Sequence, residues 1–303
     1  MRSIVVILAV AMDWLLGEPP NAFHPVAWFG RFAHTLERRA PCDNPSAELL
    51  YGVGIAASGV ALAALPAFAL ERALRSRDWT GTVVLATALK TSFAWRALIH
   101  AGEEVRRALE TNETDGARAN LCALVSRDTA QLDSSHLAAA AIESLAENAS
   151  DSFIAPLFYY HLFGLPGAFV YRAVNTIDSM IGYHGRYEFL GKISARLDDA
   201  LNWIPSRLTA LLIVVAARSR RAWQTMRRDH TRTASPNAGY PMSAMAGALD
   251  VRLEKVGHYR LNDAGRAPRP GDIRRAARIV SLALVFGTVM SVFSQILNRK
   301  SEI

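Results

Sequence analysis

The sequence LLYGVGIAASGVALAALPAFAL, residues 49–70, lies between Glu48 and Glu71 and contains no Asp, Glu, Lys or Arg. A helix of this length, at about 1.5 Å per residue, can cross the roughly 30 Å hydrocarbon core of a bilayer. The segment therefore predicts a transmembrane helix. Residues 279–298 also lack these four residue types and predict a second strong span.

The composition also indicates a membrane protein. Of the 303 residues, 51% are hydrophobic and only 20% are charged, which excludes a disordered chain. The mean hydropathy is +0.12, and a positive value indicates that much of the apolar material faces lipid rather than a water-bounded core. We expect one membrane domain that covers residues 1–303.

Further apolar segments are weaker. Residues 152–171 carry no Asp, Glu, Lys or Arg, but Pro156, Gly164 and Pro166 interrupt them, which favours a broken or re-entrant segment. The other candidates are short or contain charged residues: 4–16, 80–99 and 208–217. The sequence thus predicts an all-α, polytopic integral membrane protein with about five membrane helices, one candidate re-entrant segment and cytoplasmic helical loops.

Positive charge is concentrated in one part of the chain. Residues 218–278 contain 14 Lys and Arg against 5 Asp and Glu, a balance of 14 − 5 = +9, whereas the whole chain carries +7. Such a basic segment is expected on the cytoplasmic side, next to anionic lipid headgroups. Nucleic acid is the alternative partner, but aromatic residues are few and no helix-turn-helix or zinc motif is present, so we expect none.

The first apolar segment contains Asp13, and the turn after it contains Glu18, three prolines and His24. An ionisable residue inside a span is costly and therefore marks a candidate functional site. Rigid prolines would hold Glu18 and His24 at the membrane surface. The alternative is that both Asp13 and His24 are interfacial residues, and that Pro19 and Pro20 only end the helix.

A second polar group lies on the helix predicted after the N-cap residue Asp133, where apolar residues recur at intervals of three and four. Glu143, Glu147 and Asp151 recur every four residues on another face, with Asn148 beside them. Stacked carboxylates repel one another unless a cation lies between them, and oxygen ligands suit Mg²⁺. The alternative is a solvated polar face, but the absence of Lys and Arg there favours the cation site.

Other polar residues lie near apolar segments, where buried polar groups need partners. Asn175 and Asp178 are three residues apart, and Asp198 and Asp199 precede Asn202. Paired carboxylates with an asparagine and nearby arginines are typical of metal–phosphate sites. Residues that could contact phosphate are Arg127, Asp128, Arg172, Arg196 and Arg207.

The sequence contains no P-loop. Gly185 and Gly191 are separated by five residues, and Ile193 follows Lys192, so the spacing differs from G-x-x-x-x-G-K-[ST]. A nucleotide would therefore be held through carboxylate-bound Mg²⁺ and arginines rather than by a glycine-rich loop.

Several of these motifs, in order and spacing, resemble the CobD/CbiB family of adenosylcobinamide-phosphate synthases. The resemblance covers nearly the whole chain and rests on residues 13–26, 126–129, 142–148, 155–159, 171–180, 195–205 and 235–241. It implies an integral membrane enzyme of cobalamin biosynthesis. Its reaction would join (R)-1-amino-2-propanol, or its O-phosphate, to adenosylcobyric acid, giving adenosylcobinamide or its phosphate.

The implied ligation requires activation of a carboxylate, for which ATP with Mg²⁺ is the usual route. We expect Glu143, Glu147, Asn148 and Asp151 to act around Mg²⁺ and the γ-phosphate. Asp178 with Asn175, and Asp198 with Asp199, would surround a second cation or the substrate. Glu18 or His24 is the expected base. The residues expected to contact phosphates are Arg127, Asp128, Arg172, Arg196 and Arg207.

The resemblance also implies a multi-pass location in the bacterial inner membrane, with the active site on the cytoplasmic face. Its partners would be the lipid bilayer, the small-molecule substrates and other membrane-bound enzymes of cobalamin assembly. The alternative is a non-enzymatic sensor or scaffold of the AmpE-like kind, which would be expected to lose the acidic and Asn residues. A transporter would predict inverted repeats, and the two halves show no internal similarity.

Overall fold

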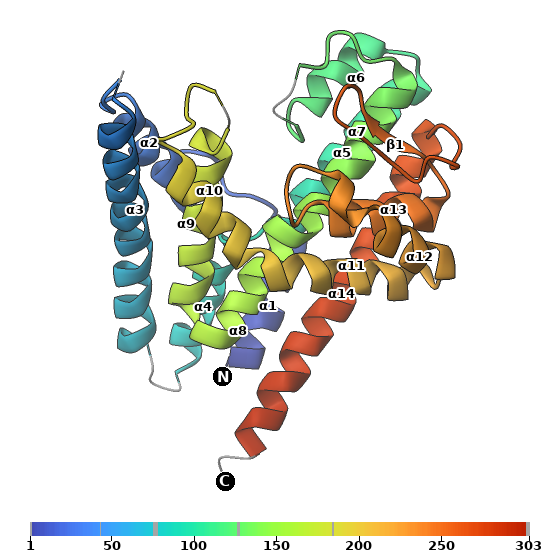
Figure 1. The fold of residues 1–303 in the computed structure, drawn as a ribbon. Helices are drawn as coiled ribbons and strands as arrows, with labels where there is room; N and C mark the ends of the chain where they lie inside the picture. The colour runs from blue at the N-terminus through green and yellow to red at the C-terminus, as the bar shows by residue number, and fades with distance from the viewer. Residues whose placement is uncertain (1, 43, 75–77, 126–127, 184, 301–303) are drawn as a thin grey trace. The chain divides into compact units, whose positions relative to one another are not determined.

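The computed structural model describes residues 2–42, 44–74, 78–125, 128–183 and 185–300, and these residues are mostly helical (Figure 1). In chain order the elements are α1 (Arg2–Leu16), α2 (Pro25–Glu37), α3 (Pro45–Ala73), α4 (Trp79–Lys90), α5 (Trp95–Glu110), α6 (Thr114–Leu121), α7 (Ser134–Ala149), the π-helical turn η1 (Ser150–Ile154), α8 (Ala155–Phe163), α9 (Leu165–Ile181), α10 (Lys192–Leu201), α11 (Trp203–Ala217), α12 (Arg220–Asp229), the 3₁₀ turn η2 (His230–Arg232), α13 (Gly239–Leu249), β1 (Leu253–Lys255), β2 (Tyr259–Leu261) and α14 (Pro270–Lys300).

Three helical segments of the described chain are long and apolar enough to cross a membrane: Pro45–Ala73, Trp79–Glu110 and Pro270–Gln295. They coincide with the two strong predicted spans and with one weaker candidate. Helices α10 and α11 add a fourth if they form one span. The structure thus supports a helical membrane protein with three to four candidate spans, and the figure of about five stays a prediction.

The segment at residues 152–171 is interrupted as its prolines and glycine predict. Helix α8 ends at Phe163, Gly164 has a φ of +71°, and Pro166 lies in the first turn of α9. A positive φ is strained for residues with a Cβ atom, so glycine fits this break between the helices. That this segment re-enters the membrane stays a prediction.

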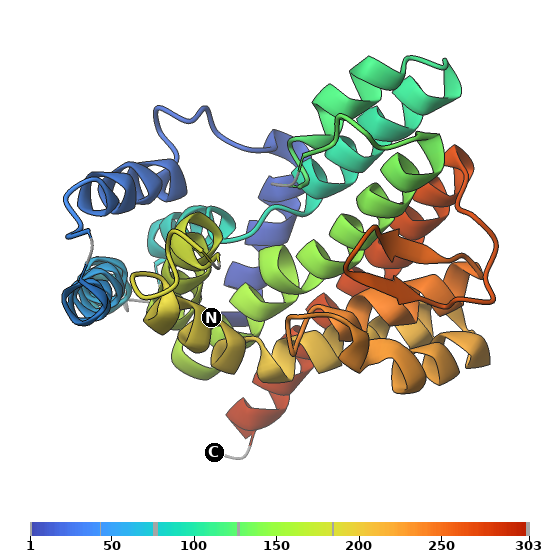
Figure 2. The same ribbon diagram turned by 45° about the horizontal axis from the view of Figure 1, so that its top comes forward.

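One feature of the fold was not predicted. Strands β1 and β2 form an antiparallel hairpin in which Leu253 lies opposite Leu261, and both side chains are buried. Figure 2 shows the hairpin as a pair of arrows beside the helices of its unit. The all-α prediction therefore describes the helices correctly and misses this hairpin.

The described chain divides into two compact units. The first consists of Met1–Ala94, Ala155–Asn202 and Met290–Ile303, and the second of Trp95–Ile154 and Trp203–Val289. Each unit is assembled from segments that are far apart in the sequence. The expectation of one membrane domain over residues 1–303 stays a prediction.

In the first unit, α3 runs antiparallel to α9. The Glu71 carboxylate accepts a hydrogen bond from the backbone N–H of Leu165 at 2.9 Å, and a Cβ on Gly59 would meet the Ile177 side chain. The Glu71 carboxylate therefore caps the N-terminus of α9, where a negative charge is favourable. These two contacts fix the register of α3 and α9 along most of the length of α9.

Close packing of α3 depends on Gly52. A Cβ at this position would lie 2.1 Å from the backbone oxygen of Leu190, whereas a Cβ on Gly54 would meet nothing within 4 Å. We expect Gly52→Ala to lower the free energy of unfolding by about 1–3 kcal/mol because backbone must move. Gly54→Ala is the matched control and should be neutral or slightly stabilising, since alanine favours a helix. Thermal unfolding of both variants in detergent checks this difference, and equal loss of stability would contradict it.

In the second unit, α7 is surrounded by other elements and packs against α5, α6, α13 and β1. Most of its residues are buried, and a Cβ on Gly102 of α5 would lie 3.0 Å from Leu145. Glu143 is only 4% exposed. The alternative of a solvated polar face is therefore wrong for Glu143.

Candidate functional site

The predicted site residues are divided between the two units. The first unit contains Glu18, His24, Arg172, Asn175, Asp178, Arg196, Asp198 and Asp199. The second contains Asp128, Glu143, Glu147, Asn148, Asp151 and Arg207, and Arg127 lies outside the described residues. Each unit thus has its own set of polar residues.

Glu18 and His24 are in contact, as the motif suggested. His24 Nε2 lies 2.9 Å from Glu18 Oε2, and His24 Nδ1 accepts a hydrogen bond from the backbone N–H of Val26. Because Nδ1 is an acceptor, the ring proton lies on Nε2 and is donated to Glu18. His24 is also the N-cap of α2, so this pair holds the turn that leads into that helix.

Lys90 completes this group, although the sequence did not single it out. Its Nζ lies 2.8 Å from Glu18 Oε1 and 3.8 Å from Asp13 Oδ1. Asp13 is fully buried and the Lys90 side chain is only 7% exposed, so the two charges offset each other in a poorly solvated place. The signal in the sequence was that Asp13 and Lys90 are charged residues within otherwise apolar stretches, 4–16 and 80–95.

The surroundings of Glu18 keep it ionised. Burial alone would raise the pKa of its carboxyl, but the hydrogen bonds from His24 and Lys90 lower that pKa below its usual range. Both oxygens of the Glu18 carboxylate are thus in contact with a partner, and His24 Nδ1 is hydrogen-bonded to the backbone N–H of Val26. The role of base predicted for Glu18 or His24 stays a prediction, and their visible role is to fix the turn.

A second polar cluster of the first unit is centred on Asp198. Asn175 Nδ2 donates to Asp198 Oδ1 at 3.2 Å, and Asn202 Nδ2 donates to Asp198 Oδ2 at 3.0 Å. The hydroxyl of Tyr171 donates to Asn202 Oδ1 at 2.8 Å. The carboxylate is thus held by two neutral amides from α9 and the end of α10, without a basic residue among these contacts. Tyr171 is the member that sequence reasoning missed.

Neighbouring residues extend this Asp198 cluster. Arg172 Nη1 donates to Asn175 Oδ1 at 3.3 Å, which links a guanidinium to the amide that contacts Asp198. Asp199 lies 4.0 Å from Arg196, at the limit of an ion pair. The Asp178 carboxylate lies against Gly182 at the end of α9.

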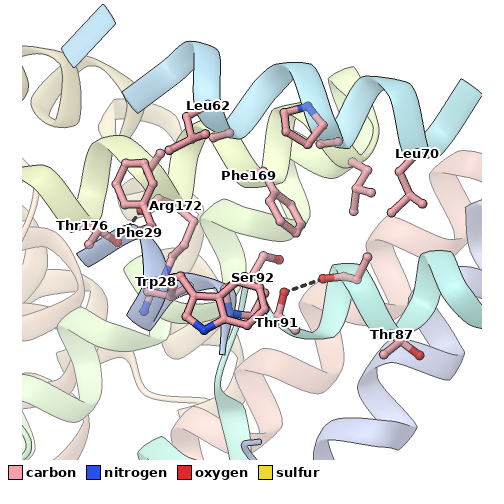
Figure 3. Close-up of a pocket in the computed structure, with 18 of the residues that line it drawn as sticks. Trp28, Phe29, Leu62, Leu70, Thr87, Thr91, Ser92, Phe169, Arg172 and Thr176 are labelled. Carbon is pink, nitrogen blue, oxygen red and sulfur yellow. Dashed lines mark hydrogen bonds between the residues drawn. The ribbon is translucent and has the colours of Figure 1, made fainter. Parts of the chain in front are cut away.

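A cavity of about 750 Å³ lies beside Arg172 in the first unit (Figure 3). It is enclosed by α2, α3, α4, α9 and the turn before α2, and its lining is largely apolar. Figure 3 shows Trp28, Phe169 and Leu62 around it, together with Arg172. No pattern in the sequence marked this cavity.

In the second unit, Asn148 connects the end of α7 with the π-helical turn. Its Nδ2 donates to the Ser144 side chain at 3.0 Å, and its Oδ1 accepts from the Ser152 hydroxyl at 3.1 Å. Glu147 and Asp151 are half-buried beside it. π-Helical turns often occur at functional sites because they displace side chains from the regular helical register. Asp151 lies in this turn and Glu143 and Glu147 lie in α7, so the regular α-helical register that predicted one shared face does not extend to Asp151.

Arg207 is held between two aromatic rings. Its guanidinium carbon lies 4.4 Å from the centre of the Trp203 ring and 4.2 Å from that of Tyr240, and Nη1 donates to Asn237 Oδ1. Cation–π contacts of this kind fix the guanidinium plane while leaving its edge available. Asp128, by contrast, accepts a hydrogen bond from the backbone of Ala130 and forms a local turn.

Within the residues that the structure describes, no three His, Cys, Asp or Glu side chains are close enough to form a metal site by themselves. Mg²⁺ is commonly held by one or two carboxylates together with waters and substrate phosphates.

Comparisons with known proteins agree with the resemblance seen in the motifs. The family described as CobD/Cbib protein matches residues 6–282. The chain is 42% identical to the cobalamin biosynthesis protein CobD of Dehalococcoides mccartyi, over 95% of this chain and 96% of that protein. It is 44% identical to the probable CobD proteins of Thermococcus kodakarensis and Pyrococcus abyssi, over 94% and 91% of this chain and 93% and 91% of theirs. No solved structure matches the chain.

Proposed function

Because the chain belongs to the CobD/CbiB family and thus to cobalamin biosynthesis, we propose that it is an ATP-dependent amide ligase of the membrane. Its substrates are adenosylcobyric acid, ATP and (R)-1-amino-2-propanol or its O-phosphate. The products are adenosylcobinamide, or its phosphate, with ADP and inorganic phosphate. The carboxylate of the corrinoid acid thereby becomes an amide.

The observation that carries this proposal is the Asp198 cluster. An aspartate held by Asn175 and Asn202, with Arg172 one hydrogen bond away, offers both a carboxylate and a cation within one unit. A ligase that handles a carboxylate, a phosphoryl group and an amine needs such paired functions. A sensor or scaffold has no need for this arrangement.

The proposed chemistry has two steps. An oxygen of the corrinoid carboxylate attacks the γ-phosphorus of ATP, which breaks the bond to ADP and forms an acyl phosphate. The amine nitrogen then attacks the acyl carbon, phosphate leaves with that carboxylate oxygen, and a base accepts the proton from nitrogen. Arg172 would bind an anionic oxygen, and Asp198 would bind the amine or accept its proton, so that Asp198 joins Glu18 and His24 as a candidate base.

Each unit by itself offers oxygen donors of the kind that Mg²⁺ prefers. They are the adjacent carboxylates Asp198 and Asp199 in the first unit, and Glu147, Asn148 and Asp151 in the second. When bound, Mg²⁺ would neutralise charge on the phosphates of ATP. Arg196 and Arg207 stay candidates for phosphate contacts, and Glu143 stays a candidate for binding Mg²⁺ and polarising the γ-phosphate, with Asp178 as a further oxygen ligand.

We place this reaction at the cytoplasmic face of the bacterial inner membrane. The basic segment at residues 218–278 supports that side, because positive loops stay in the cytoplasm and ATP is available there. Other membrane-bound enzymes of cobalamin assembly are the proposed neighbours.

The test is an amide-forming assay on purified protein in lipid nanodiscs. We expect the corrinoid product, identified by mass, only when adenosylcobyric acid, the amine, ATP and Mg²⁺ are all present. Assays of the free and phosphorylated amine identify the true substrate. If folded protein neither forms product nor consumes ATP, the ligase proposal is wrong and the AmpE-like sensor reading replaces it.

A further inference from the structure

The side chains that line the cavity beside Arg172 indicate what kind of ligand it can bind. Two of the candidate membrane spans line it, through Leu62 and Leu70 of α3 and Val84 of α4. Aromatic rings of Trp28 and Phe169 face it as well (Figure 3). A ligand in this space therefore has an apolar body.

The hydroxyl groups in the lining are already engaged within their own helices. Thr87 donates to the backbone oxygen of Val83, Thr91 to that of Ala88, and Thr176 to that of Arg172. Because their protons are already donated, these hydroxyl groups can only accept weak hydrogen bonds from a ligand. Arg172 is the charged side chain among the lining residues, so the ligand meets one cation in otherwise apolar surroundings.

The register of α3 and α9 gives the depth of Arg172. Leu165 contacts Glu71 and Ile177 contacts Gly59, so 177 − 165 = 12 residues of α9 lie along 71 − 59 = 12 residues of α3. Arg172 is therefore level with Ala64. This is six residues, or about 9 Å at 1.5 Å per residue, inside the charge-free run that ends at Leu70.

Placing a charged arginine at that depth in a membrane costs free energy. Such an arginine therefore usually faces a cavity or an anionic partner. Lipid headgroups remain at the membrane surface, so their phosphates are poor candidates for this position. The anion is then part of a ligand whose apolar body can enter the cavity. ATP and aminopropanol phosphate have no such body.

We propose that this cavity binds the apolar edge of the corrinoid acid, with its free carboxylate at Arg172. The inference rests on the proposed ligase function and assigns that enzyme its corrinoid pocket. The amide-bearing parts of the macrocycle stay at the open mouth. The hydrogen bonds from Arg172 through Asn175 to Asp198 then put the carboxylate next to the cluster that handles the amine.

The first experiment fills the cavity. Leu62→Trp adds bulk to the lining, and Val53→Trp is the matched control, because both residues are about half exposed on α3 but Val53 does not line the cavity. Binding of adenosylcobyric acid is followed by ultrafiltration and corrin absorbance, without ATP or amine. We expect Leu62→Trp to raise Kd by about tenfold or more and Val53→Trp to leave it unchanged. Equal binding by both variants would overturn the assignment.

The second experiment tests the carboxylate contact. Arg172→Gln should weaken binding of adenosylcobyric acid on the order of 10- to 100-fold, the usual value of a charge-assisted hydrogen bond. Binding of adenosylcobinamide, in which an amide replaces this carboxylate, should change by less than about threefold. Equal weakening of both ligands would contradict the placement of the carboxylate.

The outcomes separate this inference from the proposed function. If wild-type protein forms the amide but Leu62→Trp binds the corrinoid normally, the cavity assignment fails and the ligase proposal stands. If corrinoid binding follows the cavity variants but no amide forms, the pocket stands and the ligase proposal fails. Native mass spectrometry also tests whether the cavity binds lipid. If wild type carries a bound phospholipid that only Leu62→Trp lacks, and Leu62→Trp still binds the corrinoid, then the cavity is a lipid site and the inference is wrong.

Discussion

Replacing Lys90 with methionine is expected to lower the free energy of unfolding by about 3–5 kcal/mol, the usual result of removing one partner from a buried ion pair. The substitution removes the ammonium group that lies 2.8 Å from Glu18 Oε1 and 3.8 Å from the fully buried Asp13 carboxylate. Thermal unfolding in detergent measures the effect, which corresponds to a fall in Tm of roughly 10 °C. Lys192→Met, at an exposed lysine of the same unit, is the control and should change Tm little.

Acid unfolding gives a second readout for Lys90. The pKa of Glu18 is lower in the folded protein than in the unfolded chain, despite burial, because of its hydrogen bonds from His24 and Lys90. Its carboxylate therefore stabilises the fold above its unfolded pKa, and that contribution is lost as the pH falls through the folded pKa. Without Lys90 the folded pKa should rise, so Lys90→Met should unfold at a higher pH than wild type. Identical Tm and acid midpoints would show that the ion pair is not structural.

Substitution of Asp198 by asparagine should reduce amide formation by about 10²–10⁴-fold, the range typical of a residue that transfers a proton in the transition state. The change removes the charge and keeps the size of the side chain, but its single amide oxygen can accept only one of the two hydrogen bonds that Asp198 accepts from Asn175 and Asn202. Initial rates at saturating ATP and amine measure the loss.

The adjacent Asp199 is the matched comparison. Asp199 lies 4.0 Å from Arg196, whereas Asp198 accepts the hydrogen bonds from Asn175 and Asn202. Asp199→Asn should therefore reduce the rate less than Asp198→Asn does, when both rates are measured below the unfolding temperatures of the two proteins. A larger loss in Asp199→Asn would reverse the roles assigned to the two carboxylates.

The two strong candidate spans could be predicted from the sequence because their physical requirement is local. The charge-free run at residues 49–70 is sufficient to indicate a span, and Gly164 with Pro166 is sufficient to indicate where a helix breaks. The hairpin was missed because strands of three residues, such as Leu253–Lys255, carry too few positions to display an alternating pattern.

The candidate site was predictable only where its contacts are close in sequence. Glu18 and His24 were identified as a pair from one turn, and Asp198 with Asn202 from one helix. The partnership of Lys90 with Asp13 and Glu18 joins segments more than 70 residues apart, and no spacing rule reveals it. The same is true of Tyr171 and of the cavity, since both depend on how α9 packs against distant elements.

Following the carboxylate oxygen atoms of adenosylcobyric acid into the products tests the ligase proposal most directly. Adenosylcobyric acid labelled with oxygen-18 in its free carboxylate is incubated with the protein, the amine, ATP and Mg²⁺, and the phosphate products are examined by mass spectrometry. Activation through an acyl phosphate predicts that each amide formed transfers one labelled oxygen to inorganic phosphate. Amide formation that leaves every phosphate product unlabelled, or that proceeds without ATP, would contradict the account.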